Sequence, residues 1–315
     1  MLARTGPTLK MLMLLPALLL AGCNDEKEAT AVVQTPAAQV ETAKYNGYVT
    51  VANINSNTFQ EALAKHLTDI APALKSDKPI ERFEVVPVLQ VTNVRKRLDD
   101  ALAREGSIPE IDPVARGFAE ALKAFDPVNG GLANYAESKG FMADGGKRAR
   151  EGEAAYLAAL ETVAIEERAF LGRVQERDEK LTLANYENAP EGSVERYRAG
   201  AILHAKAAMK NATRVFTTPQ DEQARMVFTA SLDAMAGMVE SWDTALRKEK
   251  PEGCPILQGN FNRVVAGGRR AAQSAKEGRF DVTSSPIGVI VQQEYNILRM
   301  GFASLIDNLN RPYIC

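Results

Sequence analysis

Two histidines are the first candidates for acid–base or metal chemistry in this chain of 315 residues. His66 lies one position before Leu67, an apolar residue at helical spacing from its neighbours, so we expect its side chain to be half exposed. No acidic residue or second histidine lies three or four positions from His204, which excludes a metal-binding pair on one helix. Both histidines are predicted to be structural, with His204 at a buried or boundary position.

Neighbouring carboxylates are the second candidates, because glycoside hydrolysis uses two acids that face each other across a cleft. Such pairs include Asp99–Asp100, Glu166–Glu167 and Asp221–Glu222. Adjacent acids on a helix point about 100° apart and are normally solvated. The sequence has no Gly-x-Ser-x-Gly motif, Walker loop or dinucleotide fingerprint, and its Gly267-Gly268-Arg269-Arg270 lies mid-helix without a preceding strand. We expect a protein that is not an enzyme and that uses no cofactor and no metal.

Tyrosine and asparagine side chains combine contact surface with hydrogen-bonding groups and are the third candidates. Tyr45 and Tyr48 lie where the expected folded region begins, and Tyr295 and Asn296 lie in the last expected helix. One interpretation is packing of the first helix against the last. The other is a ligand groove between these two helices, lined by the four residues.

Cys23 follows an N-terminus that is typical of export. Arg4 and Lys10 precede the apolar run 11–21, which at ~1.5 Å per residue is too short to cross a ~30 Å hydrocarbon core. This arrangement predicts a signal peptide over residues 1–22. Its end, Leu-Ala-Gly-Cys, resembles the bacterial lipoprotein signal, in which the cysteine receives diacylglycerol on its sulfur and cleavage falls just before it. We expect Cys23 to carry several acyl chains, which hold a protein durably on a membrane.

Residues 23–42 are predicted to be the lipidated cysteine and a flexible tether, because this polar stretch cannot bury enough apolar surface to offset chain entropy. Asn24, rather than Asp, follows the cysteine, and the sorting rule of enteric bacteria then favours the outer membrane, on its periplasmic side. Removal of Arg4 and Lys10 leaves 36 basic against 40 acidic residues, a net charge of −4 that gives no electrostatic basis for binding nucleic acid.

Helical periodicity dominates the predicted folded domain, residues 43–315, and strand alternation is nearly absent. Apolar residues recur at steps of three and four, as on one face of a helix. Stripes of this kind are Phe59, Leu63, Leu67, Ile70 and Leu74; Tyr156, Leu160, Val163, Phe170 and Val174; Phe228, Leu232, Met235, Val239, Trp242 and Leu246; and Tyr295, Leu298, Phe302, Leu305 and Leu309. The stripes predict an all-α fold, an elongated antiparallel bundle of about seven or eight helices. Either there is one bundle or there are two stacked sub-bundles, with a joint near residues 189–192.

Cys254 and Cys315 are the remaining cysteines in a chain expected to reach an oxidising compartment. An antiparallel order of the last three helices places both at the same end of the bundle, as a disulfide requires. We expect a disulfide between Cys254 and Cys315.

Two stretches, together with the lipoprotein signal, resemble the YiiG family of bacterial lipoproteins. The first is Tyr45-Asn46-Gly47-Tyr48, and the second is LANYAESKGFMADGGKRAREGEAAYLAAL. The second carries Tyr135, Ser138, Lys139, Gly140, Phe141 and Asp144 at the matching positions, whereas Ala136 stands where a second aromatic is expected. The resemblance implies a helical domain of unknown function from about Tyr45 onward and transfers no catalytic residue. The same residues also describe a helix–helix hinge, with Gly140 as a left-handed cap and Asp144 capping the next helix.

The sequence therefore predicts a lipid-anchored envelope protein whose helical domain binds an envelope protein or a cell-wall component, with the membrane as a partner through the N-terminal lipid. A small-ligand or cell-wall binding protein with an interhelical groove is the alternative, and an envelope hydrolase is a third.

Overall fold

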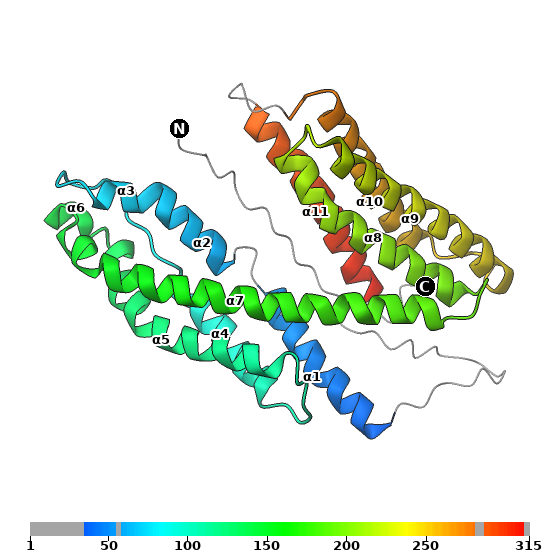
Figure 1. Ribbon diagram of the computed structural model, residues 1–315, viewed down its shortest axis with the longest axis horizontal. Coiled ribbons are helices and arrows are strands. Elements are labelled where there is room, and N and C mark those ends of the chain that lie inside the picture. The colour runs from blue at the N-terminus through cyan, green and yellow to red at the C-terminus, as the bar shows by residue number, and fades with distance from the viewer. Residues whose placement is uncertain (1–34, 55–57, 281–286, 312–315) are drawn as a thin grey trace. The chain divides into compact units, whose positions relative to one another are not determined.

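The computed structural model describes residues 35–54, 58–280 and 287–311 (Figure 1). Within these ranges every regular element is a helix, so the predicted all-α class is confirmed. The chain divides into two compact units, described over residues 35–177 and 178–311 with the gaps given above. None of the described helices combines the length and the apolar character that crossing a membrane requires.

The described residues hold eleven α-helices and one π-helical turn, more than the seven or eight helices predicted, and eight of the helices have 15 residues or more. They are α1 (Pro36–Ala52), α4 (Val88–Leu102), α5 (Asp112–Glu137), α7 (Lys147–Asn188), α8 (Val194–Thr217), α9 (Glu222–Glu249), α10 (Pro255–Lys276) and α11 (Ile287–Leu309). Three short helices, α2 (Phe59–Lys65), α3 (Ala71–Leu74) and α6 (Phe141–Asp144), accompany them, and a π-helical turn (His66–Ile70) joins α2 to α3.

Helix α1 begins earlier than the sequence pattern predicts. Pro36 is at its first turn, and the side chain of Thr35 accepts a hydrogen bond from the backbone N–H of Ala38 at 3.3 Å. Residues 36–42, expected to belong to the tether, are therefore helical. A Thr-Pro start signal lies in the sequence at this point, and its capping strength outweighs the small, polar composition of the first turns.

The two units meet within α7, between Arg177 and Asp178, rather than near residues 189–192 as predicted. The reason is local packing. Asp178 and Thr182 both contact Lys206 of α8, so the last turns of α7 belong to the second unit. The Pro-Gly-containing loop that suggested a joint connects two helices of that unit.

The core of the first unit contains a row of rings in contact. Centroid distances from 5.0 to 6.3 Å link successive members, and the members come from α1, α2, α5, α7 and the π-helical turn. In order, the row is Tyr48, Phe170, Phe118, Phe59, Phe125, Tyr156 and His66. Edge-to-face and offset contacts of this kind add to the free energy gained by burial.

The π-helical turn changes which residues of its segment face this core. A single continuous helix over residues 59–74 would bury Leu67, but Leu67 is 45% exposed and His66 is only 4% exposed. A π turn has more residues per turn than an α-helix, so it shifts the facing position by about one residue. The prediction of a half-exposed His66 is therefore wrong.

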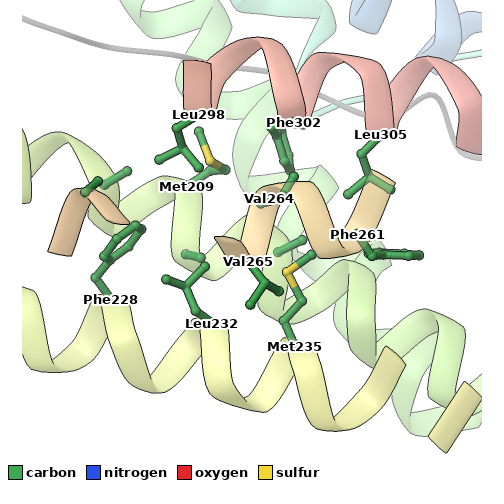
Figure 2. Close-up of a cluster of buried hydrophobic side chains, with 14 of the residues drawn as sticks. Met209, Phe228, Leu232, Met235, Phe261, Val264, Val265, Leu298, Phe302 and Leu305 are labelled. Carbon is green, nitrogen blue, oxygen red and sulfur yellow. The ribbon is translucent and has the colours of Figure 1, made fainter. Parts of the chain in front are cut away.

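The second unit is built from α8, α9, α10 and α11 around the apolar stripes that the sequence predicts. Phe228, Leu232 and Met235 of α9 lie beneath α10, and Leu298, Phe302 and Leu305 of α11 lie on its other side (Figure 2). Each of these six side chains is at most 2% exposed. Spacing alone therefore identified the core residues that α9 and α11 contribute to this unit.

Helices α10 and α11 are antiparallel. The hydroxyl of Ser304 donates to Asn260 Oδ1 at 3.2 Å, and farther along the pair Ser274 donates to Glu294 Oε1 at 3.0 Å. Residues early in α10 therefore face residues late in α11. Cys254, at the N-terminus of α10, is 1% exposed. Cys315 lies outside the described residues, so the Cys254–Cys315 disulfide stays a prediction.

We expect Gly268→Ala to destabilise the protein, because a Cβ at Gly268 would lie 2.6 Å from Leu232 Cδ1 and 3.2 Å from the ring of Phe228. Overpacking of this kind costs ~1–3 kcal/mol. Gly267→Ala is the matched control, since its Cβ would meet nothing nearer than 3.7 Å. In urea denaturation the control should be neutral or up to ~1 kcal/mol more stable. Equal midpoints for the two variants would contradict this packing.

The disulfide can be tested in protein exported to an oxidising compartment. We expect a Cys254–Cys315 peptide pair in a non-reduced digest, and Cys254→Ser should remove it. The bridge closes a loop of ~60 residues, for which the chain-entropy description gives ~4 kcal/mol of stabilisation. Alkylation of both thiols without prior reduction would show that the bridge does not form.

Candidate functional site

The tyrosines predicted to line a groove from α1 are buried in the first unit. Tyr45 is 1% exposed; its hydroxyl donates to the carbonyl of Val174 at 3.5 Å, and the guanidinium of Arg177 lies 5.2 Å from its ring centroid. Tyr48 is fully buried and donates a 2.7 Å hydrogen bond to Asp112 Oδ1. Both rings therefore serve as attachment points for α1.

Lys44 and Asp112 form a buried ion pair beside Tyr48, with Nζ 3.5 Å from Oδ2 and side chains 5% and 8% exposed. Lys44 also donates to the carbonyls of Gly106 and Arg104, at 3.0 and 3.3 Å. Burial alone would raise the pKa of Asp112, but hydrogen bonds from Tyr48 and from the N–H of Ile108, together with the charge of Lys44, hold it below its ordinary value. The network fixes α1 to the loop that precedes α5.

The other two predicted groove residues belong to the second unit. Tyr295 is 5% exposed and packs edge-on against Phe216 of α8, with ring centroids 5.2 Å apart, while Asn296 is half-buried. The four residues are thus shared between two units, and the structure describes each pair within its own unit. The ligand groove stays a prediction.

His66 makes a contact that sequence spacing did not reveal. Its Nε2 lies 3.0 Å from both carboxylate oxygens of Glu153 on α7, and Glu153 is 20% exposed. The imidazole packs against the ring of Tyr156, whose hydroxyl accepts a 3.0 Å hydrogen bond from the N–H of Val86. A carboxylate that orients an imidazole is one part of the arrangement used in general acid–base catalysis. A π turn is also a common feature of functional sites.

Glu167 is a second acid of α7 that faces the core, and it is 5% exposed. Its Oε2 accepts a hydrogen bond from the backbone N–H of Gln60 at 3.2 Å, in the first turn of α2. Burial raises the pKa of Glu167 to about 8, and the charge of Glu61 acts in the same direction, whereas backbone donors of α2 lower it. At neutral pH this carboxyl is therefore mostly protonated.

The loop carrying the lipoprotein-family resemblance is a hinge around Asp144. Tyr135 donates to Asp144 Oδ1 at 2.6 Å, and the same carboxylate accepts from the N–H groups of Gly146 and Arg148 at the start of α7. The predicted capping role of Asp144 is confirmed. The predicted left-handed cap is not at Gly140 but at Lys139, with φ +54°. Gly140 is required for space instead, because a Cβ there would lie 2.6 Å from the ring of Tyr135.

A third buried acid of α7, Asp178, pairs with Lys206 of α8. Lys206 Nζ lies 2.8 Å from both carboxylate oxygens and 2.7 Å from the hydroxyl of Thr182. Burial raises the pKa of Asp178 and lowers that of Lys206, because it disfavours both charged forms. The attraction between the two charges acts in the opposite direction. This pair holds the end of α7 against α8.

Three acids of α7 that face the core share one signal in the sequence, and the expectation that Glu167 is solvated is wrong. Glu153, Glu167 and Asp178 continue the apolar stripe of α7 at the same steps of three and four that relate Tyr156 to Val174. An acid at a core-facing helical position requires a partner or a raised pKa. Each of the three has one or the other.

His204, by contrast, is half-buried as predicted, and burial lowers its pKa. Across the part of the chain that the structure describes, no three His, Cys, Asp or Glu side chains are grouped so that they would hold a metal ion.

Lys206→Met should destabilise the protein by ~3–5 kcal/mol, because it leaves the charge of Asp178 buried without its partner. Lys210→Met is the matched control. Lys210 lies one turn farther along α8 and pairs with Glu179 at 2.8 Å, but the side chains of Lys210 and Glu179 are both exposed. The control should cost ~0–1 kcal/mol. Chemical denaturation at pH 7 measures both, and similar losses for the two variants would show that burial of the Lys206 pair does not matter.

A comparison with curated proteins gave no match, and a comparison with solved structures gave none either. A protein family described as "Protein of unknown function (DUF3829)" matches residues 39–311. The match begins within α1 and extends beyond the end of α11, so it covers both units. The chain belongs to this family of unknown function.

Proposed function

We propose that the protein is a bacterial lipoprotein whose helical domain is carried on the periplasmic side of the outer membrane. Support comes from the order of features along the chain. A basic start and a short apolar run end in Leu20-Ala21-Gly22-Cys23, and the family domain begins 16 residues after Cys23, at residue 39. Several acyl chains on Cys23 would attach the domain through residues 24–35.

The resemblance to the YiiG family is part of this proposal. Tyr135, Gly140 and Asp144, which carry it, contact one another in a single hinge between α5 and α7. This supports kinship with helical lipoproteins and assigns no reaction.

We propose further that the domain acts by binding another component of the cell envelope. The observation that carries this is the use made of its buried and partly buried charges. Lys44 and Asp112 attach α1, Lys206 and Asp178 attach α8, and Arg150 donates to the carbonyls of Leu74 and Ser76. These groups hold helices together, as in a scaffold that presents a surface.

An envelope hydrolase is the second candidate, and the His66–Glu153 pair is the observation that favours it. The pair supplies an oriented imidazole beside a carboxylate that is 20% exposed. Turnover would require a substrate to reach this pair. The two candidates therefore differ in whether His66 is needed for a reaction or only for packing.

Cells that produce the native protein, Cys23→Ala or Cys254→Ser should be grown with an alkyne-tagged palmitate and then treated with a membrane-permeant crosslinker. We expect the native protein and Cys254→Ser to carry the tag and to sediment with outer membranes, because only Cys23 accepts lipid. Cys23→Ala should be untagged and periplasmic. Mass spectrometry should identify an envelope protein, or a peptidoglycan adduct, enriched with the two anchored forms.

An untagged native protein would contradict lipidation. If the purified mature domain hydrolysed peptidoglycan fragments with saturable kinetics, and His66→Asn abolished this while urea denaturation showed an intact fold, the binding proposal would give way to the hydrolase.

A further inference from the structure

Residues 58–76, which we call the strap, lie along α7 and contact it at three places in antiparallel order. At the beginning, Gln60 bonds through its N–H to Glu167 and through Oε1 to the Nε of Arg168, at 3.2 and 3.0 Å. In the middle, His66 contacts Glu153. At the end, Arg150 donates to the carbonyls of Leu74 and Ser76. Each contact on the α7 side is made by an ionisable side chain.

The strap has little structure of its own to hold it in place. Helix α2 has seven residues, α3 has four, and a five-residue π turn separates them. Isolated helices of this length are marginal in water, so they depend on packing. The large apolar side chains that the strap buries are Phe59, Ile70 and Leu74, and Phe59 lies between Phe118 and Phe125 in the row of rings. Detachment of the strap would interrupt that row.

The contact at Glu167 is the one most sensitive to charge. Glu167 is 5% exposed. From α2, the N–H of Gln60 donates to it and the carboxylate of Glu61 opposes its ionisation. On α7 itself, Arg168 is bonded to Gln60, and Glu166 points towards α5, where a Cβ at Gly117 would lie 2.5 Å from Glu166 Oε2. No opposite charge among these groups is directed at Glu167, so ionisation in place is unfavourable.

We propose that the strap is a pH-controlled element, which stays docked on α7 while Glu167 is protonated and detaches locally when Glu167 ionises. Detachment gives the carboxylate access to water and uncovers Phe118 and Phe125 between α5 and α7. The proposal concerns the first unit alone and is independent of lipid attachment and of any partner.

The direction of the effect follows from the two protonation states. The docked carboxyl has its pKa raised to about 8 by burial, against 4.5 ordinarily, so docking carries no penalty at pH 4 and an increasing one above it. Between pH 5 and pH 7.5, each pH unit should lower the protection of strap amides about tenfold, and the fall should level off above pH 8.

Hydrogen–deuterium exchange of the mature chain, with rates corrected for intrinsic pH dependence, measures this protection peptide by peptide. We expect peptides of residues 58–76 to lose protection as the pH rises, while peptides of α5 and α9 do not. Glu167→Gln keeps an acceptor for the N–H of Gln60 and cannot ionise, so its strap should lose the tenfold fall in protection per pH unit. Glu166→Gln, which changes the neighbouring acid, should behave like the unsubstituted protein.

Two results would overturn the proposal. One is the same pH-dependent loss in Glu167→Gln as in the unsubstituted chain, which would place the titrating group elsewhere. The other is a parallel loss across all helices of the first unit, which would mean global destabilisation rather than detachment of the strap. A fold control by circular dichroism at pH 6 keeps the comparison valid, and a second variant, Glu167→Met, should lose the tenfold fall in the same way.

Discussion

Contact between aromatic rings is the interaction on which the first unit depends. The row from Tyr48 to His66 takes one or more rings from α1, α2, α5, α7 and the π turn, segments up to 122 positions apart in the chain. Two of these segments, α2 and the π turn, are too short to persist alone. The second unit needs no such row, because its four long helices interdigitate aliphatic and aromatic side chains along their whole length.

Three acids at core-facing positions of α7 reduce the cost of burying a carboxylate in three different ways. Asp178 has a lysine, Glu153 has an imidazole, and Glu167 has backbone donors and a raised pKa. A paired charge fixes the register of two helices, since leaving it unpaired costs several kcal/mol. A neutral carboxyl fixes position only while it keeps its proton. The same face of α7 therefore holds its neighbours both through ion pairs and through a carboxyl that does so only while it is protonated.

Periodicity was sufficient to predict the core-facing sides of α9 and α11, because long stripes such as Phe228 to Trp242 meet apolar partners on the neighbouring helices. It failed where tertiary contacts decide local geometry. The ring of Tyr156 and the carboxylate of Glu153 favour His66 over Leu67 at the core. The ring of Tyr135 leaves no room for a Cβ at Gly140, and the left-handed residue is Lys139. Glu153 lies 87 positions from His66, beyond the reach of a local pattern, and the lipid and partner remain inferences from sequence.

Helix α7 continues without interruption through the division between the two units, since residues 177 and 178 are consecutive positions in its interior. Boundaries between compact units usually fall in exposed linkers, which proteases cut and which tolerate insertions. Here the backbone at the boundary is hydrogen-bonded from both directions. A protease would find no entry at this point, and a gene fragment ending there would leave four carbonyls of the shortened helix without donors. Expressing either unit alone would therefore require a cut inside a helix.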